Sequence, residues 1–218
     1  MNGESNASAT SMRTLNPAEQ TPQDTYKLLV GSVVPRPIAF VSSIDARGVR
    51  NLAPFSFFTV ASANPPIVCF CPMVRGANSK DLASSKDTLR NIIATREFVL
   101  NIVSEEFAEQ MNACAAELPP EVDEFEISGL TPLPSELVRP PRVGESHVQM
   151  ECRLEQVVHV STEPLGGSLV LGEVLRFHIR ESLLDNFRID PDQLHAIGRM
   201  AGSTYARTTD RFELVRPK

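Results

Sequence analysis

The chain has 218 residues, a formal net charge of -6 and a pI near 5.3, with 42% hydrophobic and 22% charged residues. These values are typical of one soluble globular domain, and no run of about 18 apolar residues predicts a membrane helix. The acidic balance argues against a nucleic-acid partner, which needs a clustered basic face, and still allows a local anion pocket.

We expect a disordered tail over residues 1–20, a single domain over residues 21–210 and a C-terminal tail over residues 211–218. The first segment is rich in Ser, Asn, Ala, Glu and Thr and lacks the apolar core of a secretory signal. Thr21-Pro22-Gln23-Asp24 then supplies a capping hydroxyl, a first-turn proline and an acid. A short helix through Leu29 is therefore predicted.

The next part of the chain has the pattern of β-strands. Residues 38–44 form a predicted strand, residues 45–48 a turn, and residues 51–62 a strand-like stretch of aromatics, small residues and hydroxyls. Asn64-Pro65-Pro66 ends that stretch, and residues 67–71 are apolar enough for the middle of a sheet. Strands that follow one another without a crossover helix indicate antiparallel hairpins.

Helices are inserted after these strands. We predict a helix that begins at residues 84–88, a strand over residues 98–103, a helix over residues 105–116 and a proline-rich loop over residues 119–144. The loop carries three apolar residues, namely Phe125, Ile127 and Leu130. A loop of this length is expected to pack over the barrel or over a partner subunit.

The C-terminal third is dominated by a second hairpin. Two long strands are predicted over residues 148–160 and 168–179, joined near Gly166-Gly167. A last helix is predicted over residues 191–200, followed by residues 201–207, which are too polar for a core. Antiparallel hairpins with inserted helices favour a closed or nearly closed β-barrel over a doubly wound sheet.

Motifs of several enzyme classes are missing from the sequence. There is no GxGxxG after a strand, no P-loop and no GxSxG elbow. The four cysteines form no CxxC pair and read as small buried hydrophobes in a reduced, cytoplasmic setting: Cys69, Cys71, Cys114 and Cys152. The four histidines are scattered without metal-ligand spacing: His147, His159, His178 and His195. No metal site is predicted.

Two stretches have the composition of a ligand pocket. Residues 51–62 mix aromatic and hydroxyl side chains on both faces of a strand, which suits a flat, partly polar ligand, although an ordinary core strand has the same pattern. The helix start supplies hydroxyls, an ammonium and backbone N–H groups suited to a phosphate, from Ser84, Ser85, Lys86 and Thr88. Simple helix capping is the alternative for this second stretch.

Several motifs then match one family in order and spacing. They are Arg36-Pro37-Ile38-Ala39, Asn51-Leu52-Ala53-Pro54-Phe55-Ser56-Phe57-Phe58, Asn64-Pro65-Pro66, Lys86-Asp87-Thr88-Leu89-Arg90-Asn91-Ile92, Glu97-Phe98-Val99-Leu100-Asn101, Val122-Asp123-Glu124-Phe125, Gly129-Leu130-Thr131-Pro132, Gly198-Arg199-Met200 and Tyr205-Ala206-Arg207. In this pattern the chain resembles the flavin reductase-like, FMN-binding split-barrel family over residues 26–207. The loop at residues 74–79 has the Gly/Arg character of the family without an exact match.

The resemblance implies a mainly β fold with inserted helices, a six-stranded antiparallel split β-barrel, and a homodimer with FMN at the subunit interface. Residues 51–62 would line the isoalloxazine ring and ribityl chain, and residues 86–88 would lie near the phosphate. The expected cofactor-binding residues are Arg36, Asn51, Leu52, Ala53, Pro54, Phe55, Ser56, Phe57, Thr59, Ser62, Lys86, Asp87, Thr88 and Tyr205.

The implied function is hydride transfer from NADH or NADPH to FMN, with no acid or base required of the protein, and with a partner monooxygenase among the candidate acceptors. Arg36 or a backbone amide of the central stretch is a candidate to stabilise charge near flavin N1 and O2, the alternative for Arg36 being a surface ion pair. A non-catalytic flavin- or haem-binding module is the second hypothesis, because fold alone does not determine function.

Overall fold

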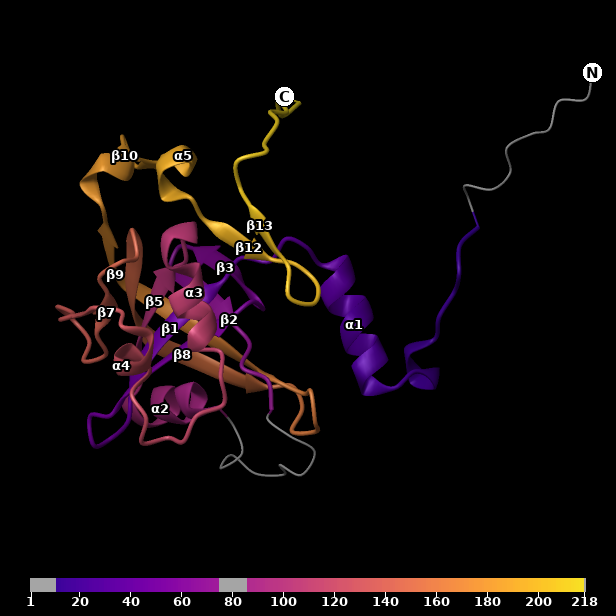
Figure 1. The fold of residues 1–218 in the computed structure, drawn as a ribbon, viewed down its shortest axis with the longest axis horizontal. Helices are drawn as coiled ribbons and strands as arrows, with labels where there is room; N and C mark the ends of the chain where they lie inside the picture. The colour runs from indigo at the N-terminus through magenta and orange to yellow at the C-terminus, as the bar shows by residue number, and fades with distance from the viewer. Residues whose placement is uncertain (1–10, 75–85, 218) are drawn as a thin grey trace, which may run out of the picture.

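The computed structural model describes residues 11–74 and 86–217, and its centre is one seven-stranded sheet (Figure 1). Its strands are β1 (Ala39–Ile44), β2 (Arg50–Phe55), β3 (Phe58–Ala63), β4 (Pro66–Phe70), β5 (Glu97–Ile102), β8 (Val148–His159) and β9 (Ser168–Ile179). They follow the order β2-β1-β5-β8-β9-β4-β3, and every neighbouring pair is antiparallel. The prediction of antiparallel hairpins, including the long one formed by β8 and β9, is confirmed.

The sheet has one strand more than the six expected, because residues 51–62 do not form a single strand. Ser56 and Phe57 interrupt the stretch, and the β2 and β3 strands on either side lie at opposite ends of the strand order. Three peptide steps span at most about 11 Å, so the two edge strands meet at this bend. The sheet therefore curls into a barrel that is split along the seam between β2 and β3.

The barrel interior is filled by aromatic and aliphatic side chains. Phe70 packs against Phe55 and Phe98, with ring centroids 5.0 and 5.6 Å apart. Gly172 makes room for this packing, since a Cβ there would lie 2.2 Å from the Phe98 ring. β1 is buried along its whole length because Ala39 faces this interior and Phe40 belongs to a second core outside the barrel.

The second core is built by the segments inserted after β5. It packs the η3 turn (Glu105–Phe107), the helices α3 (Ala108–Ala113) and α4 (Glu124–Ser128), and the paired strands β6 (Pro132–Leu133) and β7 (Arg142–Val143) against β1 and β2. The expected helix over residues 105–116 is thus a 3-10 turn and a shorter α-helix. Within the proline-rich segment Phe125 and Leu130 are buried against their own chain, while Ile127 is half-exposed. Of the two expectations for this segment, packing over the barrel is confirmed.

Two helices carry residues that matter for the site. α1 (Pro22–Ser32) begins at Thr21, whose hydroxyl accepts a hydrogen bond from the Asp24 N–H, as predicted. The helix projects away from the barrel, with only Val30 buried (Figure 1). α2 (Asp87–Thr95) lies on the other side of the barrel and packs on β1 and β2. The expected N-terminal tail contains one 3-10 turn, η1 (Pro17–Glu19), and residues 1–10 lie outside the described part of the chain.

The predicted helix over residues 191–200 is wrong. α5 (Pro191–Leu194) is a single turn, because His195 adopts a left-handed conformation with φ 48° and ends it. The chain then forms β12 (Ile197–Arg199), which pairs with β13 (Tyr205–Arg207). Before it lie the η4 turn (Glu181–Leu183) and the β10 (Leu184–Asp185) and β11 (Arg188–Ile189) pair. No helix within residues 11–74 and 86–217 is long and apolar enough to span a bilayer.

Candidate functional site

The bend between β2 and β3 divides the predicted ligand wall into buried and accessible residues. Leu52 and Phe55 are buried in the two cores, so the alternative of ordinary core residues describes their side chains. The next residues are partly or largely accessible: Ala53, Pro54, Ser56, Phe57, Phe58, Thr59 and Ser62. The accessible wall is therefore centred on the bend, where aromatic rings lie beside hydroxyls.

A buried polar network fastens this wall to α2 and α4. Asn51 accepts a hydrogen bond from the Thr88 hydroxyl at 2.6 Å and donates one to Glu124 at 2.9 Å. The other carboxylate oxygen of Glu124 accepts the Leu52 backbone N–H at 3.1 Å. Because Thr88 is 1% exposed and its hydroxyl is directed at Asn51, both side chains hold the wall in position. Burial raises the pKa of Glu124, and hydrogen bonds to its carboxylate only partly offset this.

Lys86 joins the start of α2 to the wall. It is the N-cap residue of the helix and makes no side-chain capping bond there, and its Nζ lies 5.4 Å from the centre of the Phe55 ring. Asp87 is buried and forms an ion pair with Arg90. An ammonium at a helix N-terminus suits a phosphate, and Phe55, although its ring is buried, adjoins the accessible wall in sequence, so these residues fit the flavin that the sequence indicates. Ser84, Ser85 and the loop at residues 75–79 lie outside the described residues.

Arg36 supports the bend from inside the protein. It is 6% exposed, and its guanidinium donates to the carbonyls of Val30 at 2.6 Å, Val33 at 2.8 Å and Met200 at 2.9 Å. Its Nε–H donates to the Ser56 hydroxyl at 3.3 Å. The alternative of a surface ion pair is therefore wrong, and four of the five N–H donors of the guanidinium are already used. Arg36 ties α1 and β12–β13 to the bend.

Tyr205 reaches the same bend from the C-terminal hairpin. Its hydroxyl donates to Asn112 Oδ1 at 3.2 Å, and Arg199 stacks on its ring at 4.5 Å. Together with Pro54 and Ser56, these three residues line a cavity of about 160 Å³. Tyr205 was a predicted site residue and Arg199 belongs to a family motif, but Asn112 on α3 had no signal of its own. The β12–β13 pairing places Arg199 beside Tyr205.

An apolar groove lies on the other side of the bend. It has a volume of about 500 Å³ and is lined by α1, the following loop and β3, through Leu29, Val33, Pro35, Phe57, Phe58 and Thr59. Leu28 and Leu29 on α1, Val33 directly after it and Val60 on β3 are between 45% and 66% exposed. No sequence pattern indicated this groove, since it depends on how α1 leaves the barrel. Within the described residues no group of three His, Cys, Asp or Glu is arranged to hold a metal ion.

Comparison with known proteins gives one consistent result. Residues 30–212 match the model of the flavin reductase-like domain. The component B of nitrilotriacetate monooxygenase from Bacillus cereus is 40% identical with a TM-score of 0.88, over 94% of this chain and 100% of that one. The 2-nitrobenzoate 2-nitroreductase of Pseudomonas fluorescens is 33% identical with a TM-score of 0.82, over 94% and 96%. An uncharacterised protein of Aquifex aeolicus is 40% identical over 90% of this chain and 96% of its own.

Proposed function

The chain belongs to the family of flavin reductase-like domains, and on this basis we propose that it is an FMN-dependent oxidoreductase that takes hydride from NADH or NADPH. The observation that carries the proposal is the meeting of two family motifs. Lys86 lies against Phe55 and Thr88 is bonded to Asn51, although the residues of each pair are more than thirty positions apart in sequence. An ammonium and a helix N-terminus thus lie next to the segment that carries the accessible aromatic wall.

Each part of the site has a separate task in this proposal. Bound FMN supplies the hydride-accepting chemistry, and the protein positions it and sets its electrostatic surroundings. Lys86 and the N-terminus of α2 hold the phosphate by charge-assisted hydrogen bonds. The wall from Ala53 to Thr59 positions the planar ring, and the Asn51–Thr88–Glu124 network keeps the wall and the phosphate site at a fixed separation.

The electron acceptor is proposed to be a small molecule or a flavin-consuming monooxygenase. Two relatives above 30% identity carry names of these two kinds, a monooxygenase component and a nitroreductase. The cavity beside Tyr205 and the groove beside α1 give the wall two accessible flanks, where a nicotinamide and an acceptor could approach the same ring. Reduction and reoxidation rates of the bound flavin test the proposed donor and the proposed acceptor.

We also propose that the protein is a homodimer, with α1 as a contact. Leu28 and Leu29 on a helix that projects from the barrel, and Val33 directly after it, are largely exposed, and a second copy would bury them. The proline-rich segment, which the sequence offered as a partner contact, does not serve this purpose, because Phe125 and Leu130 are buried within their own chain. Multi-angle light scattering of the wild type and of Leu29→Lys tests the contact: a monomeric wild type contradicts it.

Anaerobic stopped-flow reduction tests the enzymatic proposal. Protein loaded with FMN is mixed with NADH or NADPH, and the flavin absorbance near 450 nm is followed. Rapid loss of that absorbance with at least one nicotinamide is expected, and free FMN at the same concentration is the control. A bound flavin that stays oxidised with both donors would show that the protein is a binding module, and a Soret band in the purified protein would show that haem is the ligand.

A further inference from the structure

A second polar pocket lies away from the flavin wall, where β7 meets the start of β8 and the end of β9. It has a volume of about 520 Å³, and its polar lining comes from Arg142, Ser146, His147, Gln149, His178 and Arg180. Aspartate and glutamate are absent from the described residues that line it. It shares no lining residue with the cavities that flank the β2–β3 bend. The pocket is therefore a separate feature of the molecule.

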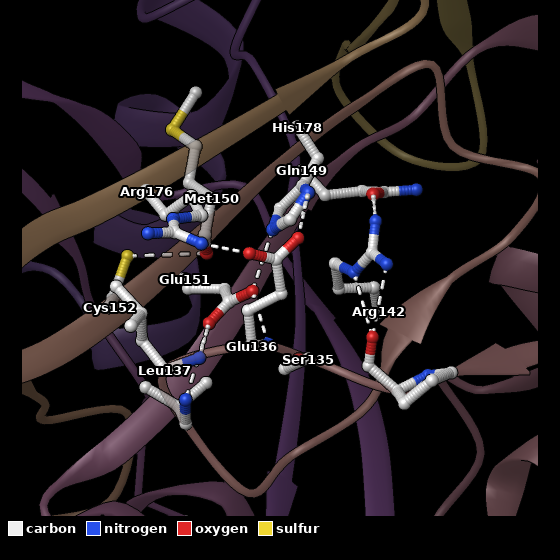
Figure 2. Close-up of polar contacts among 12 residues, drawn as sticks. Ser135, Glu136, Leu137, Arg142, Gln149, Met150, Glu151, Cys152, Arg176 and His178 are labelled. Atoms are coloured by element: carbon white, nitrogen blue, oxygen red, sulfur yellow. Dashed lines mark hydrogen bonds and ion pairs between the residues drawn. The ribbon is translucent and has the colours of Figure 1, made fainter.

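The two arginines give this pocket positive charge that carboxylates do not neutralise. Arg142 is held by neutral oxygens, the Pro134 carbonyl at 3.0 Å and Gln149 Oε1 at 2.9 Å, so it is oriented and keeps its charge. Figure 2 shows Arg142 and Gln149 in contact, with His178 next to them. The Arg180 guanidinium is exposed and makes no hydrogen bond or ion pair within the described residues. Two guanidinium groups at one cavity favour an oxyanion.

Two histidines contribute imidazole rings to the pocket lining. His147 is 9% exposed, and its Nδ1 atom is buried without a hydrogen-bond partner among the described residues. Burial lowers the pKa of His147 and the charge of Arg180 lowers it further, against the opposing charge of Glu106. His178 Nε2 is bound to Glu151 at 2.6 Å, and the neighbouring Glu136 carboxylate is paired with Arg176. Glu151 and Glu136 thus both face His178, which lines the pocket, but neither carboxylate is part of the lining itself.

We infer that this pocket binds an organic phosphate of mononucleotide size. The donors come from three places in the chain, β7, the turn before β8 and the end of β9, which suits the three oxygens of a phosphate better than the two oxygens of a planar carboxylate. The volume exceeds that of a lone phosphate and falls in the range of ligand pockets, so room remains for an organic group. This inference does not depend on the proposed oxidoreductase function.

Calorimetric titration of the protein with adenosine 5′-monophosphate tests the site. FMN is kept saturating, so that the flavin site cannot report binding, and the flavin spectrum shows that it stays occupied. We expect the monophosphate to bind, inorganic phosphate to compete with it, and adenosine to bind at least about 10-fold more weakly, because it lacks the charge-assisted bonds. Equal binding of adenosine and its monophosphate overturns the inference.

Two arginine variants locate the binding. Arg180→Gln removes a side chain that makes no hydrogen bond or ion pair within the described residues, so the fold should be unaffected, and it should weaken binding of the monophosphate about 10-fold or more. Arg188→Gln is the matched control, since it removes an exposed arginine outside the pocket and should change affinity less than about 2-fold. Equal losses in the two variants, or absence of binding to the wild type at about 10 mM ligand, overturns the inference.

Discussion

Glu124 and Glu151 are both buried carboxylates, yet their surroundings differ. Glu124 is 7% exposed and accepts hydrogen bonds from the Asn51 amide and the Leu52 N–H. Glu151 is fully buried and accepts N–H groups from three consecutive residues, 136 to 138, at 2.8, 2.6 and 3.2 Å. It also lies 2.6 Å from His178 Nε2, as Figure 2 shows.

The difference follows from how many donors each carboxylate has. Desolvation penalises a buried charge unless hydrogen bonds replace the lost water. The donors around Glu124 are neutral and few, and burial raises its pKa. Glu151 has three backbone amides and a histidine ring as partners, and these contacts hold the loop at residues 136–138 to β8. The Glu151 cluster is therefore a structural lock, while the Glu124 network supports the candidate flavin wall.

The largest expected effect is on stability at Glu151. Glu151→Ala leaves three backbone N–H groups and His178 without their acceptor, which should lower the free energy of unfolding by about 3–5 kcal/mol. Urea unfolding measures this. Glu155→Ala, on the exposed side of the same strand, is the control and should stay within about 0.5 kcal/mol of the wild type. Similar losses in the two variants would contradict the structural lock.

The next largest effect concerns the phosphate at the flavin site. Lys86→Ala should weaken FMN by about 1.5–3 kcal/mol, roughly 10- to 150-fold, and should leave riboflavin nearly unchanged, because riboflavin has no phosphate. Fluorescence titration with both ligands gives the comparison. Thr88→Val removes the bond to Asn51 and should weaken both ligands in proportion, since it loosens the wall. A proportional loss in Lys86→Ala as well would place the phosphate elsewhere.

The pH dependence of stability tests the surroundings of Glu124. A raised folded-state pKa means that the protonated Glu124 stabilises the fold below its ordinary value of 4.5, and that this contribution is lost as the pH rises through the folded pKa. Glu124→Gln stays neutral and loses about 1–2 kcal/mol through one mismatched hydrogen bond. Its stability relative to the wild type should therefore improve as the pH rises from about 4.5 to 7.5.

Urea unfolding over this pH range measures the difference, with Glu126→Gln as the control. Glu126 lies on the same helix, and its side chain is 77% exposed, so the control should show no comparable trend. A stability difference between Glu124→Gln and the wild type that does not change with pH would show that burial does not raise the pKa of Glu124.

The smallest effect is expected outside both networks, at Tyr205. Tyr205→Phe removes one hydrogen bond to Asn112 and keeps the ring under Arg199, so flavin reduction should slow by a factor of about 2 to 10, equivalent to about 0.5–1.5 kcal/mol. Stopped-flow reduction measures the rate. Tyr205→Ala also removes the ring from the cavity and should have the larger effect. Unchanged flavin affinity and rate in both variants would make this segment a surface loop.

Local sequence determined much of the fold. Thr21 and Pro22 specified the start of α1, the turn before β2 and the Gly166-Gly167 turn specified hairpins, and the motifs around Asn51 and Lys86 indicated the family. These features depend on residues close together in the chain, so capping, turn chemistry and alternation are sufficient to reveal them. The helix predicted over residues 191–200 was wrong. Asp190 and Pro191 do start a helix, but it ends after one turn at His195.

Tertiary structure alone decided which residues of the motifs are accessible. Arg36 looked like a surface or ligand-binding cation and is buried among carbonyl groups, and Thr88 looked like a phosphate ligand and is directed at Asn51. Asn112, Arg199 and the arginines of the second pocket became neighbours of their sites only through strand pairing and loop packing. The physical reason is that burial and hydrogen-bond partners come from segments far apart in sequence, and local patterns carry no information about them.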